Sequence, residues 1–157
     1  MLRIGLISDT HGLLRAEALD VLRGADHLIH GGDIGDRTIL DALAAIAPVT
    51  AVRGNNDRAG WDHLGDDALL LFEDVRVYVL HDASELRRRA PPADVQVVVA
   101  GHSHRPSVVE RAGVLWVNPG SAGPRRFRLP ISVGELIVDR SRVEARVVEL
   151  QATASAR

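Results

Sequence analysis

The chain of 157 residues contains no cysteine. Disulfides, thiolate zinc sites and cysteine nucleophiles are therefore excluded. A protein that uses no disulfide is typical of a reducing compartment, so we expect a cytoplasmic location.

Aromatic residues and long apolar runs are also scarce. Five aromatic residues are scattered along the chain, and the net charge is −2 with both signs interspersed. This composition offers neither the stacking platform nor the positive surface that long nucleic acids require, so we expect no such partner. The uncharged stretches are short: residues 42–52, for example, contain Pro48, and none approaches the ~18 residues of a membrane span. No membrane contact is expected either.

The order of the predicted elements indicates the fold class. A chain of this length buries roughly 70% of the surface that it exposes when unfolded, so we expect one domain spanning residues 1–157, with a frayed tail from about Gln151. Short aliphatic strands alternate with helical patterns in the first half, and strands dominate the second. This order predicts an α/β protein with two packed β-sheets and helices on the outside.

Six short polar segments each follow a run of aliphatic residues. They are Asp9-Thr10-His11, residues 32–36, residues 54–57, His81, residues 101–104 and residues 118–121. Each should lie at the carboxyl end of a strand, where open α/β sheets place their sites. Together they supply two carboxylates, one amide and four imidazoles, which are too many ligands for one metal ion but suit two.

The spacing within these segments suggests how they could bind metal. Asp9 and His11 stand at positions i and i+2, as do His102 and His104, and in extended backbone such residues point to the same side. Asp33 has two carboxylate oxygens and could bridge two ions. The mixed ligands favour two divalent ions of borderline type, with manganese expected first and iron, zinc or nickel as alternatives.

In order and spacing, these segments resemble the motifs of the calcineurin-like metallophosphoesterase superfamily, and in particular its small prokaryotic phosphodiesterase branch. The resemblance covers about residues 2–126. It implies a four-layer α/β/β/α sandwich, with two mixed β-sheets flanked by helices, and a dinuclear metal centre. It also implies two ligand sets that share Asp33. The first is Asp9, His11, Asp33 and His104, and the second is Asp33, Asn55, His81 and His102.

The resemblance further implies a metal-dependent phosphoesterase acting on a small phosphate ester, with phosphodiesters expected first. A hydroxide bridging the ions would attack phosphorus in line. Two alternatives stay open. One is a phosphomonoesterase or nucleotidase with the same site, and the other is a non-catalytic scaffold similar to a retromer subunit of this fold. Whether the chain forms a homo-oligomer is also left open.

Two positions depart from the superfamily pattern. Asn56 stands where the wider superfamily has histidine, and Asp82 follows His81 where glycine is usual. Asn56 and Asp57 are the candidate catalytic residues, and Asn56 is also a candidate for binding substrate. An amide cannot give up a proton near neutral pH, so Asn56 is not expected to act as a general acid.

Four further residues have a structural interpretation beside a functional one. Arg53 and Arg125 are candidates for contact with the substrate phosphate, or they are ordinary surface arginines. Asp36 could support a metal ligand from behind, or it only caps the helix expected over residues 38–47. His30 matches no ligand position and is expected to be structural or solvated; burial behind the site is the further alternative.

Overall fold

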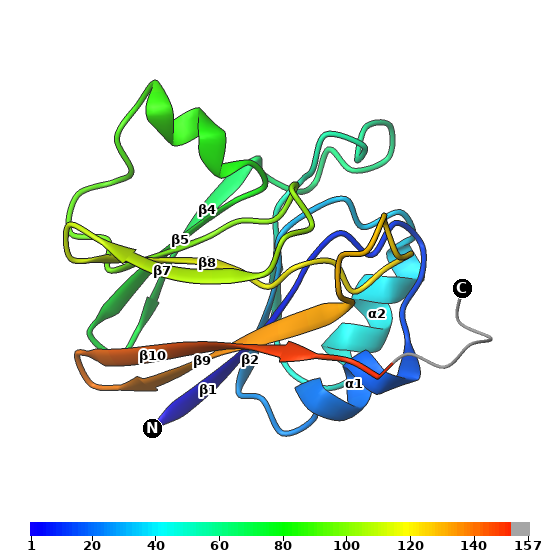
Figure 1. Ribbon diagram of the computed structural model, residues 1–157, viewed down its shortest axis with the longest axis horizontal. Helices are drawn as coiled ribbons and strands as arrows, with labels where there is room; N and C mark the ends of the chain where they lie inside the picture. The colour runs from blue at the N-terminus through cyan, green and yellow to red at the C-terminus, as the bar shows by residue number, and fades with distance from the viewer. Residues whose placement is uncertain (152–157) are drawn as a thin grey trace.

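The computed structural model describes residues 1–151, which form two five-stranded β-sheets (Figure 1). The strand order is β10-β9-β1-β2-β3 in the first sheet and β4-β5-β6-β8-β7 in the second. Both sheets are mixed: β1, β2 and β3 are parallel, as are β5, β6 and β8, whereas the remaining strands pair antiparallel with their neighbours.

The strand boundaries follow the aliphatic runs of the sequence. The first sheet contains β1 (Leu2–Ile7), β2 (His27–His30), β3 (Val49–Ala51), β9 (Ser132–Asp139) and β10 (Arg142–Glu149). The second contains β4 (Asp67–Phe72), β5 (Val75–Leu80), β6 (Val97–Val99), β7 (Ser107–Arg111) and β8 (Val114–Asn118).

Helical segments cover the outer faces of the two sheets. Helices α1 (Ala16–Leu22) and α2 (Arg37–Ala44) pack on the first sheet, and the 3₁₀ helix η1 (Ala83–Arg87) packs on the second (Figure 1). The predicted four-layer sandwich is therefore confirmed. The outer layer on the second sheet is thinner than the prediction implied, because η1 is five residues long.

Alternation along β1 shows how the layers are held together. Ile4 and Leu6 face the second sheet and pack in an apolar cluster with Val77 and Val79 of β5. Gly5 faces the helices, where an added Cβ would lie 2.6 Å from the Leu28 side chain. Successive strand residues point to opposite faces, so a single strand contributes to both cores.

The parallel strands bring the six polar segments to one region. Each segment begins at or just after the end of β1, β2, β3, β5, β6 or β8. Backbone hydrogen bonds join the segments directly: the Asp9 N–H donates to the Gly32 carbonyl at 3.0 Å, and the Gly101 N–H donates to the His81 carbonyl at 2.9 Å. The loops that carry the candidate ligands therefore pack against one another.

Residues 1–151 include no helix long and apolar enough to cross a membrane. The frayed tail predicted from Gln151 lies outside the described residues, except for Gln151 itself.

Candidate metal centre

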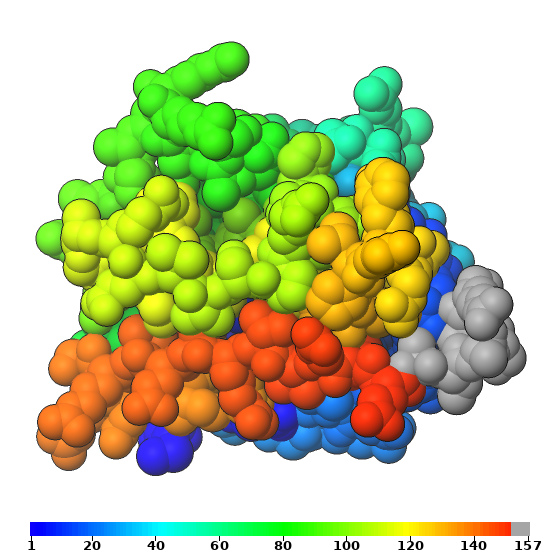
Figure 2. Space-filling view, in the orientation of Figure 1, coloured from blue at the N-terminus to red at the C-terminus, as the bar shows by residue number. Residues whose placement is uncertain are grey.

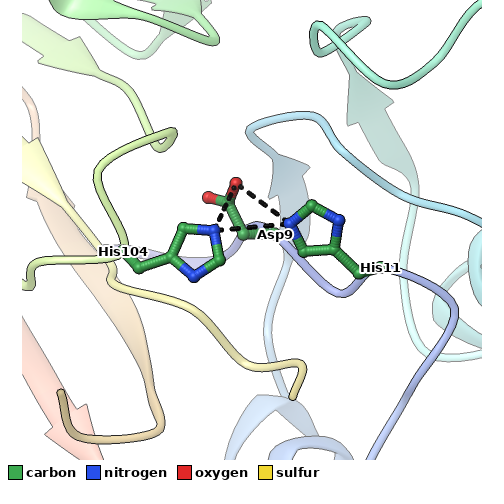
Figure 3. Close-up of side chains that lie close together, drawn as sticks. All are labelled: Asp9, His11 and His104. Carbon is green, nitrogen blue, oxygen red and sulfur yellow. Dashed lines mark hydrogen bonds and ion pairs between the residues drawn. The ribbon is translucent and has the colours of Figure 1, made fainter. Parts of the chain in front are cut away.

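Asp9, His11 and His104 converge on one point (Figure 3). Oδ1 of Asp9 lies 3.8 Å from Nε2 of His11 and 3.4 Å from Nε2 of His104. The two imidazole nitrogens are 3.3 Å apart. Two facing ring nitrogens can share only one proton, and two facing lone pairs repel each other. A cation bound between them and the carboxylate would satisfy all three atoms.

Asp9, Asp33 and His81 form a second group beside the first. Oδ2 of Asp33 lies 3.3 Å from Nε2 of His81 and 3.8 Å from Nε2 of His11. Oδ1 of Asp9 is 3.8 Å from the same nitrogen of His81. Both carboxylates therefore stand between the two groups of histidines, which is a geometry suited to bridging.

Two atoms that face the middle of this cluster are buried and make no hydrogen bond: Oδ1 of Asp9 and Nε2 of His81; Nδ1 of His104, on the other side of its ring, makes none either. Burying a polar atom without a partner costs on the order of 1–3 kcal/mol, and more when the group is charged. Oδ1 of Asp9 and Nε2 of His81 each face the other candidate ligands, and each is of a type that binds divalent metals. The residues present therefore fit divalent metal ions.

Asn55 and His102 lie on the more exposed side of the second group. The ring centroids of His81 and His102 are 5.2 Å apart. Nδ1 of His102 lies 3.2 Å from Oδ1 of Asn55, and its Nε2 lies 3.7 Å from Oδ2 of Asp82. All seven predicted ligand side chains thus lie in one region, although His102 and His104 contact different partners.

Five of the seven candidate ligands have left-handed backbone. The φ angles are 54° for Asp9, 45° for His11, 57° for Asp33, 70° for His102 and 61° for His104. The prediction that extended backbone aligns Asp9 with His11, and His102 with His104, is therefore wrong, because these residues lie in loops beyond β1 and β6. Left-handed backbone at non-glycine residues is unfavourable and concentrates at functional sites.

The second carboxylate oxygen of Asp9, Oδ2, is fixed by two hydrogen bonds. Oδ2 accepts hydrogen bonds from the Ser8 hydroxyl at 2.8 Å and from the His102 N–H at 3.0 Å. Burial opposes the charged form, but the nearby His104 and His81 outweigh it and lower the pKa of Asp9. Ser8 was not singled out from the sequence, and its place directly before Asp9 was the only signal.

Asp57 holds the Asp33 loop in place. Its side chain is buried and accepts backbone N–H groups from Asp33 at 2.7 Å, Ile34 at 3.0 Å and Gly54 at 2.8 Å. A Cβ at Gly54 would lie 2.2 Å from Oδ1 of Asp33. Because both oxygens of Asp57 already accept backbone N–H groups, the geometry favours a positioning role over the direct catalytic role considered from the sequence.

Asn56 contacts Asp33 directly. Its backbone N–H donates to Oδ1 at 2.8 Å, and its side-chain amide donates to Oδ2 at 3.2 Å. Burial alone would raise the pKa of Asp33, but His81 and the Asn56 N–H have the larger effect and lower the pKa to about 2. Asn56 is exposed and lies at the edge of the cluster, where a substrate oxygen could reach it.

His30 is fully buried beneath the ligand loops, so of the alternatives left open by the sequence it is structural and not solvated. Its Nδ1 accepts the Gly32 N–H at 3.0 Å, so Nε2 carries the proton and donates to the Thr10 hydroxyl at 3.0 Å. That hydroxyl donates to the Ile34 carbonyl at 2.8 Å. Burial lowers the pKa of His30 to about 4, so the ring is neutral near pH 7. It joins the loop after β1 to the loop after β2.

The remaining candidate residues lie around the cluster. Arg53 donates to Oδ1 of Asp66 at 2.9 and 3.0 Å, and it lines a cavity of about 350 Å³ shared with His81 and His102. Asp36 accepts the Thr38 N–H at 2.9 Å and caps α2, and its contacts are with Thr38 rather than with any candidate ligand. These contacts agree with the helix cap considered for Asp36 and not with its other considered role, which was to hold a metal ligand from behind.

Arg125 is exposed, in the loop that follows β8. Its neighbour Arg126 lies close enough to the candidate ligands to affect His11. Burial is the main cause of the lowered pKa of His11, and the charge of Arg126 adds a smaller contribution. When two arginines are adjacent in a loop, the sequence does not indicate which of them faces the site.

Comparison with known proteins identifies the family. The model of the calcineurin-like phosphoesterase superfamily domain matches residues 2–141. The chain belongs to this superfamily. The probable metallophosphoesterase MJ0623 of Methanocaldococcus jannaschii is 34% identical over 162 residues, which cover 94% of this chain and 81% of the relative. The superfamily is one of hydrolases, and its membership agrees with a divalent metal site at these residues.

Two solved structures show the same fold. Vps29 of Chaetomium thermophilum superposes with a TM-score of 0.82 at 22% identity, covering all of this chain and 93% of that one. A structure described as a novel archaeal phosphodiesterase has a TM-score of 0.77 at 23% identity, covering 94% of this chain and 100% of that one. At these identities the likeness concerns the fold.

Proposed function

We propose that the chain is a metal-dependent phosphodiesterase with a dinuclear centre. The observation that carries this proposal is the pair of adjacent ligand groups, Asp9-His11-His104 and Asp9-Asp33-His81, in which Oδ1 of Asp9 and Nε2 of His81 are buried without a hydrogen bond. Two divalent ions suit this arrangement, and manganese is expected first.

Divalent ions bound there would activate a water nucleophile and polarise the phosphoryl oxygens. The proposed ligands are the seven residues predicted from the sequence: Asp9, His11, Asp33, Asn55, His81, His102 and His104. Asp33 is the proposed bridge, since one of its oxygens lies near histidines of both groups. Two ions carry four positive charges, which two carboxylates offset only in part, so the centre would attract an anionic ester.

The protein's own side chains have separate tasks in this proposal. Asp57 fixes the position of Asp33 through three backbone N–H groups. Asn56 donates to Asp33 and to a substrate oxygen, but it cannot protonate a departing alkoxide. Arg53 and Arg125 are proposed to contact the phosphate. For Arg53 this requires an exchange of its pairing with Asp66, which is exposed and therefore weakly held.

Two alternatives share part of these observations. A phosphomonoesterase or nucleotidase would use the same centre. A non-catalytic scaffold is suggested by the likeness to Vps29. A scaffold for protein contacts has no use for a carboxylate oxygen and an imidazole nitrogen that are buried beside other candidate ligands without a hydrogen bond, and this favours an enzyme.

The test is a metal-dependent assay on two esters in parallel. Metal-stripped protein, reconstituted with Mn²⁺, is assayed on bis(4-nitrophenyl) phosphate and 4-nitrophenyl phosphate. We expect hydrolysis of the diester that requires metal and is lost in Asp33→Asn but kept in Asp36→Asn, which retains a helix cap. Faster turnover of the monoester would support the monoesterase, and metal binding without hydrolysis of either ester would support the scaffold.

A further inference from the structure

We propose that a groove between η1 and the β7–β8 pair binds the alcohol portion of the ester, and that this portion is a flat aromatic group. The inference rests on the proposed function and extends the same site. The groove has a volume of about 420 Å³, within the range of roughly 300–1,000 Å³ typical of ligand sites. On the face shown in Figure 2, η1 in green lies above β7 and β8 in yellow-green and yellow.

The groove is continuous with the candidate metal centre. Asp82 and His102 line both the groove and the cavity of about 350 Å³ that contains Asn55 and His81. A phosphate held by the candidate ligands would therefore direct one of its two ester substituents toward the mouth of the groove. No other step of the proposed chemistry uses this space.

The pairing of β7 with β8 determines which side chains follow one another along one wall of the groove. Ser107 pairs with Asn118 at the end nearest the metal centre, and Val109 pairs with Trp116 in the middle. Arg111 stands at the far end, and the three β7 residues share one face because they alternate. From Ser107 to Arg111 the strand rises roughly 13 Å. The wall is therefore polar near the phosphate, apolar in the middle and cationic at its end.

The chemistry of this wall favours an aromatic ligand. The Arg111 guanidinium lies 4.6 Å from the centroid of the Trp116 ring and extends its flat surface. The hydroxyl-bearing residues Ser84 and Ser107 line the same groove. An alkyl chain would cover these hydroxyl groups without offering hydrogen bonds, which is unfavourable. A ring with polar substituents can stack on the wall and meet them.

Two neighbouring valines provide matched variants. Val109 lines the groove and is 46% exposed, whereas Val108 is 40% exposed and lies on the other face of the same edge strand. We expect Val109→Asp to raise KM for bis(4-nitrophenyl) phosphate tenfold or more and to leave inhibition by inorganic phosphate unchanged, because inorganic phosphate has no aromatic part. Val108→Asp should change neither quantity. Equal effects of the two variants, or equal shifts in KM and in phosphate inhibition, would overturn the proposal.

A binding measurement without metal separates this inference from the proposed function. Metal-free protein is titrated with 4-nitrophenol while the indole N–H signals are followed by NMR. The Trp116 signal should shift saturably, and the signal of Trp61, which packs beneath the helices on the first sheet, should not. The shift should disappear in Val109→Asp and persist in Val108→Asp. Absence of a saturable shift at Trp116 would overturn the groove even if the protein hydrolyses diesters, whereas a specific shift would support it even if no ester were hydrolysed.

Discussion

The Nε2 atoms of His11 and His104 lie 3.3 Å apart and both face Oδ1 of Asp9. His11 follows β1 in the first sheet, and His104 follows β6 in the second. The candidate metal centre therefore lies where the two sheets meet. A metal ion there would join loops from both sheets, so its binding should affect stability as well as activity.

Metal affinity should increase with pH up to about 8. Burial disfavours protonated His81, but Asp33 and the Gly31 carbonyl outweigh this and raise the pKa of His81 to about 8 in the metal-free protein. Metal must displace that proton from Nε2, so below this pH the apparent affinity should fall, by up to about tenfold per pH unit. Calorimetric titration with Mn²⁺ between about pH 6 and 9 measures this dependence of the apparent metal affinity on pH. An affinity independent of pH in this interval would contradict the assignment of His81 as a ligand.

Substitution of Asp33 should reduce mainly activity, whereas substitution of Asp57 should reduce mainly stability. Asp33→Asn should reduce activity by a factor of about 10² or more while changing stability little, since asparagine tolerates the left-handed backbone found there. Asp57→Asn places amide hydrogens against backbone N–H groups and should lower the free energy of unfolding by about 3 kcal/mol. Denaturant unfolding and metal-saturated assays separate the two effects. If Asp57→Asn were fully stable but inactive, a direct catalytic role would replace the positioning role.

The buried His30 should make the protein less stable in acid. Its pKa is about 4 when folded and about 6.5 when unfolded. As pH falls below 6.5 the unfolded chain takes up the proton first, so the contribution of this residue is full above pH 6.5 and is lost as pH falls to about 4, by roughly 3 kcal/mol in total. Unfolding of metal-free protein over this interval should show a shallower pH slope in His30→Gln. Identical slopes would show that His30 is not the cause.

Hydrolysis rates should depend steeply on the leaving group. Asn56 donates to Asp33 but cannot protonate a departing alkoxide, an effect typically worth about 10²–10⁴ in rate. Turnover of size-matched diesters should therefore fall as the leaving-group pKa rises, and it should fall less in Asn56→His. A flat dependence in the natural protein would mean that another group delivers the proton.

The strands and the ligand chemistry could be predicted because both depend on local residue types. Aliphatic runs such as Leu2–Ile7 form the predicted strands, and the parallel order of the strands places the loops after them at one edge of the sheet. The identity of Asp9, His11 and the other candidate ligands comes from side-chain chemistry, which does not depend on the backbone angle.

The backbone of the ligand loops could not be predicted in the same way. Left-handed φ angles at Asp9 and Asp33 arise from packing between loops that are distant in the sequence, where Gly54 and Gly101 permit close approach. Asp57 resembled a catalytic residue because its position matches a motif. Its three backbone partners include two residues that precede it by more than 20 positions, and no local pattern reveals such contacts.

The most direct test of the dinuclear phosphodiesterase is the number of ions needed for full activity. Metal-free protein is titrated with Mn²⁺ while bound metal and hydrolysis of bis(4-nitrophenyl) phosphate are measured on the same samples. The two ligand groups that share Asp9 predict that activity reaches its plateau at two ions per chain. Full activity with a single bound ion, or no hydrolysis of the diester at saturating metal, would contradict the account.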